Sequence, residues 1–444
     1  MGKTVVVGSG AAGLAAAYTL EKAGVDCVVL EKRDFSGGRI YGIEREGFTL
    51  DLGAQFLFSR YRSTFDLLDS MGLKDELVLF RPPIGLLRDG QIHIASMDQK
   101  ENLRHPLEAL KLLRVLSPRG RLQMAKFGAK MLSLYRKLDF DDPYKAVELD
   151  GVSFAEYARA HFGEELLEYV IQPISSTLTL GTPEETSAAY GLALAHYFAP
   201  GLSTFKDGMG FLAKALAGRV KDLRLNTTVK RIVIEDRRVK GVELENGGKT
   251  EYIEADTVVC ATLAPEAAAL LPDLPPGITD ILSGVRYSAS THVMLAVPDR
   301  PLGKLYAIAT PRKEGFSFSG ITDSAAKTER YAPYGKGIIH AFTFGNFARE
   351  MLEMGDEEVR DRVVAEIRRI LPSFPAEHIF CEIFRWPQAV CLSGPGQIAA
   401  VQRLKTVIPG YRGLHLAGEY LGMPSVEAAV HFGVQAAERI IKSN

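Results

Sequence analysis

The chain has 444 residues, which is enough for two or three domains around a large buried core. Its 53 lysines and arginines nearly balance 54 acidic residues, so no global field favours nucleic acid as a partner. No uninterrupted apolar run approaches the ~18 residues that a membrane-spanning helix needs.

The cysteines show neither a C-x-x-C pair nor a zinc-binding spacing. We therefore expect no metal site, and we expect free thiols in a reducing cytoplasm. The four cysteines are Cys27, Cys260, Cys381 and Cys391.

A glycine-rich turn near the N-terminus joins an apolar strand, residues 4–7, to an alanine-rich helix that reaches Ala23. The turn reads G-x-G-x-x-G, which in this context predicts a dinucleotide-binding fold. Gly8 permits the tight turn, Gly10 lets the backbone approach a pyrophosphate at the helix N-terminus, and Gly13 allows close helix-to-strand packing. Because the glycines follow this pattern, we do not expect the apolar start to be a secretory signal.

The second strand, residues 27–30, ends at Glu31, whose carboxylate can accept a hydrogen bond from a ribose hydroxyl. A second glycine pair then follows in Ser36-Gly37-Gly38-Arg39, where backbone N–H groups and a permanently charged guanidinium can face phosphate. Together these motifs resemble the superfamily of flavin amine oxidases, protoporphyrinogen oxidases and carotenoid desaturases. The resemblance implies FAD as the cofactor. It also matches Asp51-Leu52-Gly53-Ala54-Gln55 to a motif near the flavin end.

A basic segment spans residues 104–138, after a predicted helix at 64–71 and predicted strands at 77–87 and 91–94. It holds nine Lys and Arg residues against the single acid Glu108, and apolar residues recur at helical spacing from Met124 onward. Two interpretations stay open. The apolar stripe lies in the core beneath a solvated basic face, which we favour, or the helix lies on an anionic membrane surface.

The middle of the chain alternates helices and strands. We expect helices at 154–169, 171–180, 187–197 and 211–217, then a β-meander at 226–254 and a parallel strand at 256–262. Residues 285–390 form a second β-rich block that a helix at 357–371 interrupts. The C-terminus adds a strand that ends at Gly418-Glu419, and a helix at 425–441 whose N-terminus carries partial positive charge.

These elements predict an α/β chain with two discontinuous domains. A Rossmann-like FAD-binding domain with a parallel sheet and a β-meander takes residues 1–85, 205–284 and 395–444. An α+β substrate-binding domain takes 86–204 and 285–394. From the motifs and the resemblance, the expected cofactor-binding residues are Gly8, Gly10, Ala12, Gly13, Glu31, Lys32, Gly38, Arg39, Val229, Gly418, Glu419 and Val426.

Three residues are candidates for the catalytic wall. Trp386, the only tryptophan, is followed by proline as in protoporphyrinogen oxidases, although Cys391-Leu392-Ser393 replaces the P-Q-Y run expected after it. His292 stands where amine oxidases often place a lysine that holds a water near flavin N5. It either holds that water, acts as a base, or is structural. By the resemblance, Tyr420 takes the place of one face of an aromatic cage around a neutral amine.

We therefore expect an FAD-dependent oxidoreductase that removes a hydride equivalent from a C–N or C–C bond of a small, mainly hydrophobic substrate. Oxygen or a quinone would accept the electrons. The enzymatic alternative is a protoporphyrinogen oxidase or a carotenoid-type desaturase. The alternative from another class is a prenyl-binding protein similar to GDP-dissociation inhibitors. We expect a cytoplasmic protein, with membrane contact through 104–138 left open.

Overall fold

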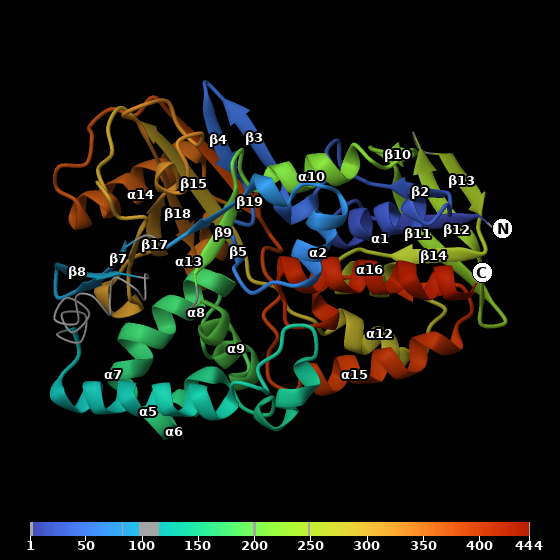
Figure 1. The fold of residues 1–444 in the computed structure, drawn as a ribbon, viewed down its shortest axis with the longest axis horizontal. Coiled ribbons are helices and arrows are strands. Elements are labelled where there is room, and N and C mark those ends of the chain that lie inside the picture. The colour runs from blue at the N-terminus through green and yellow to red at the C-terminus, as the bar shows by residue number, and fades with distance from the viewer. Residues whose placement is uncertain (1–2, 82, 97–114, 199–200, 247–248, 444) are drawn as a thin grey trace.

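The computed structural model describes residues 3–81, 83–96, 115–198, 201–246 and 249–443. A small parallel sheet lies on one side of the molecule and a larger mixed sheet on the other (Figure 1). Both ends of the described chain lie beside the parallel sheet. Within the described residues, no helix has the length and apolar content to cross a membrane.

The parallel sheet has the strand order β10-β2-β1-β14-β20, and every neighbouring pair is parallel. Successive side chains point to opposite faces, so Val6 joins the core beneath the helices while Val5 and Val7 join a second core on the other face. The strands are β1 (Thr4–Val7), β2 (Cys27–Leu30), β10 (Leu223–Arg224), β14 (Thr257–Cys260) and β20 (Leu414–Leu416).

Helices α1 (Ala11–Lys22), α10 (Gly210–Ala217) and α16 (Val426–Ser443) cover the first face. α16 approaches α1 so closely that a Cβ on Gly433 would lie 2.2 Å from the carbonyl oxygen of Ala12. Only glycine fits there. The first and last long helices of the chain therefore pack backbone to backbone.

The predicted β-meander covers the second face as three antiparallel strands, together with three helices. The strands are β11 (Thr228–Glu235), β12 (Arg238–Asn246) and β13 (Lys249–Glu254), and the helices are α11 (Ala264–Leu270), α12 (Pro276–Ser283) and α15 (Gln397–Val407). This arrangement confirms the predicted Rossmann-like class with a parallel sheet and a meander.

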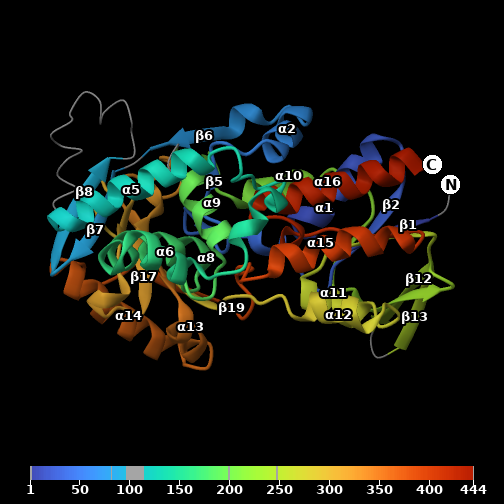
Figure 2. The ribbon, with the colours of Figure 1, turned by 90° about the horizontal axis from the view of Figure 1, so that it is seen from below.

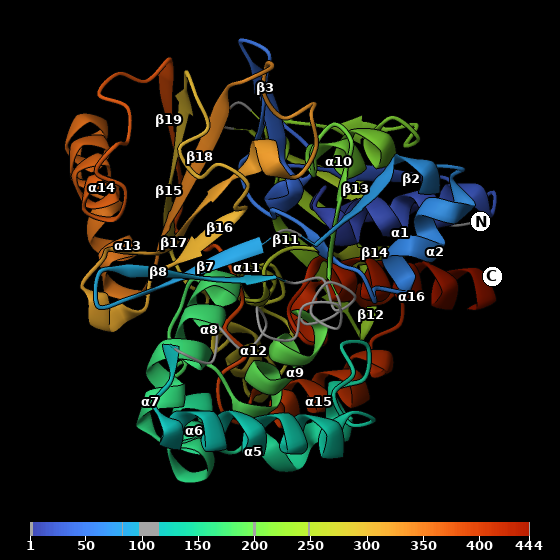
Figure 3. The same ribbon diagram turned by 60° about the vertical axis from the view of Figure 1, so that its left-hand side comes forward.

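The mixed sheet has the order β19-β15-β18-β17-β16-β7-β8, with β16 and β7 as its one parallel pair among the described strands. Its strands come from two separate parts of the chain: β7 (Pro83–Arg88), β8 (Gln91–Ser96), β15 (Ser290–Val297), β16 (Ala307–Ala309), β17 (Phe318–Asp323), β18 (Gly337–Thr343) and β19 (Phe380–Trp386). One face packs on α14 (Asp356–Ile370), next to α13 (Gly345–Met351). The other face looks toward the centre of the molecule (Figure 3).

A helical layer lies below the mixed sheet in Figure 1 and faces the viewer in Figure 2. It consists of α5 (Pro118–Leu134), α6 (Phe154–Phe162), α7 (Glu164–Leu166), a π-helical turn (Leu167–Ile171), α8 (Gln172–Thr179) and α9 (Ala188–Phe198). The single helix predicted at 154–169 is wrong. Gly163 has φ +85°, which breaks the helix after Phe162.

The basic segment 104–138 is described only from residue 115 onward, so its first part lies outside the described residues. In α5 the predicted apolar stripe of Met124, Phe127, Met131 and Leu134 packs against the main core. This is the interpretation that the sequence favoured.

A short three-stranded sheet and one more helix complete the centre: β5 (Leu57–Phe58), β9 (Leu202–Phe205), β6 (Leu77–Phe80) and α2 (Ser63–Ser70). Glu427 of α16 caps α2. Its carboxylate accepts hydrogen bonds from the backbone N–H groups of Arg62 (2.7 Å), Ser63 (2.6 Å) and Thr64 (2.9 Å). A distant acid therefore satisfies donors that helices usually satisfy with a local cap.

Candidate cofactor and substrate site

A cavity of ≈ 660 Å³ lies between the parallel sheet and the mixed sheet. It collects residues from nearly the whole length of the chain. The predicted site residues on its wall are Gly8, Gly10, Ala12, Glu31, Lys32, Gly38, Arg39, Val229, Gly418, Glu419, Val426, His292 and Trp386. Gly13 and Tyr420 do not line it.

Two glycine turns meet at one end of the cavity. The backbone N–H of Gly37 donates to the carbonyl of Ser9 (2.8 Å), and Gly8 and Gly37 adopt φ values of +97° and +105°. A Cβ on Gly13 would lie 1.9 Å from the carbonyl oxygen of Gly8, so Gly13 acts behind the turn, as its predicted packing role requires. A Cβ on Gly10 would have no atom within 4 Å, so the backbone there faces open space.

Glu31 is 8% exposed and fastens the first turn to the end of β2. One carboxylate oxygen accepts from the backbone N–H (2.8 Å) and the hydroxyl (2.9 Å) of Ser9, and the other accepts from the N–H of Arg33 (3.0 Å). These donors hold the carboxylate in place at the cavity wall. Next to it, Lys32 forms an ion pair with Glu266.

Arg39 and Glu419 form an ion pair of 2.7 Å on the cavity wall. Tyr287 donates to Glu419 (3.0 Å), and Arg39 also donates to the carbonyl of Ala389 (3.2 Å). Burial would lower the pKa of Arg39, but Glu419 outweighs that effect and raises it above its ordinary value. The pair therefore brings a fixed positive and a fixed negative group to the same wall.

Both ring nitrogens of His292 have hydrogen-bond partners within the protein. Its Nδ1 lies 3.2 Å from the carbonyl oxygen of Leu52, and its Nε2 lies 2.8 Å from Nδ1 of His340. A carbonyl only accepts, so Nδ1 of His292 carries the proton and Nε2 accepts from His340. Burial lowers the pKa of His292 to about 3, which keeps the ring neutral. No nitrogen of His292 is left to hold a water or to take a proton from a substrate.

Trp386 shares the acceptor that orients His292. Its indole Nε1 donates to the same Leu52 carbonyl oxygen (2.8 Å), and the Arg33 guanidinium lies 5.2 Å from the ring centroid. Both side chains thus fix the segment that begins at Asp51. Both residues were candidates from the sequence, but the sequence does not indicate that they bind the same backbone carbonyl oxygen.

Tyr420 is fully buried in the core beside the parallel sheet, away from the cavity wall. Gly418 explains this position, because a Cβ on Gly418 would lie 2.5 Å from the Tyr420 ring. The ring occupies the space behind Gly418 that a side chain would fill. The structure therefore does not bring Tyr420 to the place that an aromatic cage requires.

Charge is distributed unevenly along the cavity. Among the described lining residues, the charged side chains are Glu31, Lys32, Arg33, Arg39, Lys230, Glu266 and Glu419. All of them come from segments around the parallel sheet. The wall formed by the mixed sheet and the helical layer is uncharged and mainly apolar, and it includes Ile174, Leu194, Ile308 and Phe342. The sequence does not reveal this wall, because no local pattern distinguishes an apolar residue that lines a cavity from one that packs in the core.

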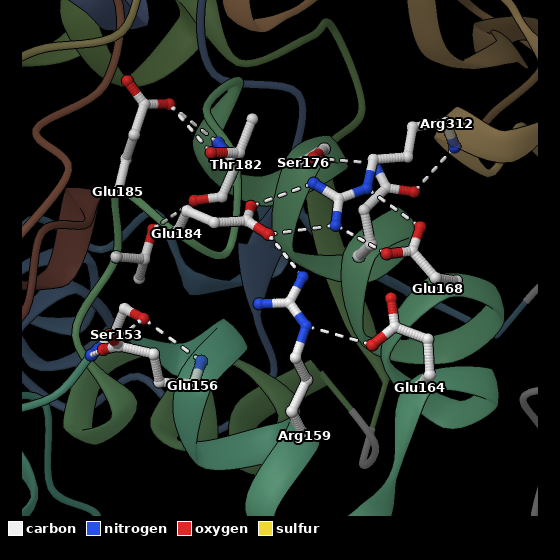
Figure 4. A network of polar contacts seen from close by, with 12 residues as sticks. Ser153, Glu156, Arg159, Glu164, Glu168, Ser176, Thr182, Glu184, Glu185 and Arg312 are labelled. Carbon is white, nitrogen blue, oxygen red and sulfur yellow. Dashed lines mark hydrogen bonds and ion pairs between the residues drawn. The ribbon is translucent and has the colours of Figure 1, made fainter.

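One arginine fastens two parts of the apolar wall to each other (Figure 4). Arg312 follows β16 and forms two hydrogen bonds to the buried carboxylate of Glu168 (2.9 and 2.6 Å), in the π-helical turn before α8. It forms two more to Glu184 (2.9 and 3.0 Å), and its backbone N–H donates to Gln172 (2.8 Å). The distance between β16 and α8 is therefore set by charged contacts outside the cavity.

The residues present fit FAD. The glycine turns, the N-terminus of α1 and open space at Gly10 suit a pyrophosphate, and the carboxylate of Glu31 suits a ribose. The N-terminus of α16 reaches the wall at Val426, where its partial positive charge stabilises an anion. Beyond these groups the cavity continues between apolar walls.

A profile of the family described as flavin containing amine oxidoreductase matches residues 11–441. The chain belongs to this family. Coproporphyrinogen III oxidase of Bacillus subtilis is 21% identical over 471 residues, covering 95% of this chain and 94% of the relative. Zeta-carotene desaturase of Synechocystis is 23% identical over 481 residues, covering 99% and 97%. The solved structure of cyclohexylamine oxidase from Brevibacterium oxydans has a TM-score of 0.74 at 18% identity, covering 100% of this chain and 99% of that one.

This flavin amine oxidoreductase is thus an FAD-dependent enzyme with the fold that the sequence predicted. Family membership sets aside the alternative of a prenyl-binding protein without redox activity. The names of these proteins span tetrapyrroles, carotenes and amines, so they do not identify the substrate of this chain.

Proposed function

We propose that this enzyme removes two hydrogens from a C–N or C–C bond of a mainly apolar substrate that binds in an uncharged form. Oxygen or a quinone takes the electrons in the second half of the reaction. The observation that carries the proposal is the apolar wall: among the described lining residues of the mixed sheet and the helical layer, none is charged. A charged substrate would lose its hydration there without gaining a partner.

The bound FAD supplies the redox chemistry by accepting a hydride equivalent. The chain's own residues bind, orient and exclude water. Phe342 stacks on the His292 ring with centroids 4.2 Å apart, which makes a flat and neutral part of the wall. The N-terminus of α16 places partial positive charge at Val426, where negative charge on the reduced cofactor would be stabilised.

The engaged nitrogens of His292 restrict how an amine could react. With no ring nitrogen free, this histidine cannot deprotonate an ammonium ion. An amine substrate would have to arrive as the neutral base. A C–C dehydrogenation of an apolar chain meets no such requirement, so carotenoid-type chemistry stays within the proposal.

The same wall argues against a porphyrinogen. Such tetrapyrroles carry carboxylates, and the described apolar wall offers no cation to pair with them. The B. subtilis relative named for coproporphyrinogen therefore shares the fold and the family with this chain, and we do not propose its substrate here.

Anaerobic bleaching of the flavin absorbance tests the proposal with a panel of aliphatic amines, aromatic amines, a polyene and protoporphyrinogen. We expect the polyene or an amine to bleach the flavin, and bleaching by any amine to speed up as the pH rises toward the ammonium pKa of about 10. Fastest bleaching by protoporphyrinogen would contradict the proposal.

Ile174 of α8 provides a matched pair of variants on the apolar wall. Ile174→Met keeps the wall apolar, whereas Ile174→Lys adds a cation of similar length. We expect I174K, and not I174M, to slow bleaching by the preferred substrate at least about tenfold. Equal bleaching rates of I174K and the unmodified enzyme with the preferred substrate would contradict the role of the uncharged wall.

A further inference from the structure

Helix α5 has a second apolar stripe on the face opposite its packed one. At 100° per residue, Leu122, Ala125, Ala129 and Leu132 share one side of the helix, away from Met124, Phe127 and Met131. Leu122 is 60% exposed and Leu132 is 78% exposed. Both alanines are exposed as well. The helix lies at the rim of the molecule, on the side away from the parallel sheet (Figures 1 and 3).

Basic residues flank this stripe, and α5 contains no acid. Arg121 lies on one side, and Arg119, Lys126 and Lys130 lie on the other. Within the part of the chain that the structure describes, Arg119, Lys126 and Lys130 form no ion pair. Tyr135, the residue after the helix, is 52% exposed. A narrow apolar ridge therefore stands between positively charged edges.

We propose that this outward face of α5 docks the enzyme on an anionic lipid surface. Leu122 and Leu132 insert between the lipids, and the flanking lysines and arginines contact lipid phosphates. A second copy of the chain is a poorer partner, because two such faces would bring their basic edges together. The sequence had suggested membrane contact through the opposite stripe. The structure buries that stripe and exposes this one. The proposal does not depend on the substrate.

Sedimentation with vesicles tests the proposal on the FAD-loaded enzyme. We expect binding to vesicles of mixed phosphatidylcholine and phosphatidylserine, little binding to phosphatidylcholine alone, and weaker binding at high salt. Leu122→Ser combined with Leu132→Ser should weaken binding to the mixed vesicles about tenfold or more. Arg119→Glu combined with Lys126→Glu should abolish the preference for anionic lipid.

Tyr334→Ser combined with Ile379→Ser is the matched control, because it removes exposed apolar side chains elsewhere on the molecule. This control should bind like the unmodified enzyme, and all variants should keep their thermal unfolding temperature and flavin spectrum. Wild-type protein that stays in solution with anionic vesicles would overturn the proposal. So would equal binding by L122S/L132S. A change in sedimentation coefficient of L122S/L132S without vesicles would instead identify the face as an interface between copies, and would overturn it too.

Discussion

His292 and His340 form a buried pair on neighbouring strands, and His292 cannot gain a proton at Nε2 without losing the hydrogen bond that it accepts from His340. Burial lowers the pKa of His292 to about 3, and that of His340 well below its usual value of 6.5. The unfolded chain, where histidine titrates near pH 6.5, therefore binds these two protons first as the pH falls.

We expect the free energy of unfolding to decrease as the pH is lowered from about 6.5 toward 4. Each of the two histidines should contribute up to about 1.4 kcal/mol per pH unit within this window. Urea unfolding at a series of pH values measures the slope. His292→Gln combined with His340→Gln should flatten it, whereas His161→Gln, at an exposed position, should leave it unchanged. An identical slope in the double variant would contradict this account.

Gly10 and Gly13 lie in one motif, but we expect their substitution by alanine to have different effects. A Cβ on Gly13 would overlap the Gly8 carbonyl, so Gly13→Ala should destabilise the protein without FAD by about 1–3 kcal/mol. A Cβ on Gly10 meets no atom, so Gly10→Ala should change that stability by less than about 0.5 kcal/mol.

Titration with FAD measures the affinity of the Gly10→Ala protein for the cofactor. In the G10A protein the new methyl group occupies the space in which the backbone faces the cavity, so we expect FAD to bind at least about tenfold more weakly. Unchanged FAD affinity in G10A would show that the pyrophosphate does not approach this turn.

At the scale of elements, Arg312 makes the position of α8 depend on β16. Removing its side chain would leave the buried carboxylate of Glu168 unpaired, at a cost of about 3 kcal/mol. We expect Arg312→Met to lose that much stability, and Arg312→Met combined with Glu168→Met to recover most of it. Urea unfolding of the four proteins in this cycle gives the coupling. Additive losses would mean that the two residues act independently.

Local patterns in the sequence were sufficient for elements whose neighbours are close in the chain. The strand at 4–7, the glycine turn and the meander follow from periodicity and turn residues, and the structure confirms them. The apolar stripe from Met124 to Leu134 likewise indicated the buried face of α5, which packs near α6 and α7, the next α-helices in the chain.

The sequence predicted the parts of the candidate site that short motifs form with their own backbone. It did not predict the parts whose geometry depends on side chains that are distant in the chain. His292 lies near Leu52 and His340 only through the tertiary fold, so its engaged nitrogens leave no trace in the sequence. Tyr420 follows Gly418 and Glu419, which line the cavity, but its own ring lies in the space behind Gly418 that a side chain there would fill. The roles of the individual cofactor-binding residues stay predictions.

At the scale of the whole molecule, the cavity joins segments from Gly8 to Val426, so bound FAD should stabilise the entire fold. At free FAD about a hundredfold above its Kd, we expect roughly 2.7 kcal/mol of added stability. Thermal unfolding at increasing FAD concentration measures the shift in Tm. In the G10A protein the same shift should need more FAD. A Tm that does not depend on FAD would contradict a cofactor site at the centre of the molecule.

The contact between Gly433 and Ala12 joins α1 to α16, two helices that lie more than 400 residues apart along the chain. A ribosome releases the glycine turn and α1 long before it has made α16. During that interval the surface of α1 that α16 covers has no partner, and the wall that Val426 supplies does not exist. The FAD site is therefore completed only after α16 has been made, and a nascent chain that stops before residue 426 cannot assemble it.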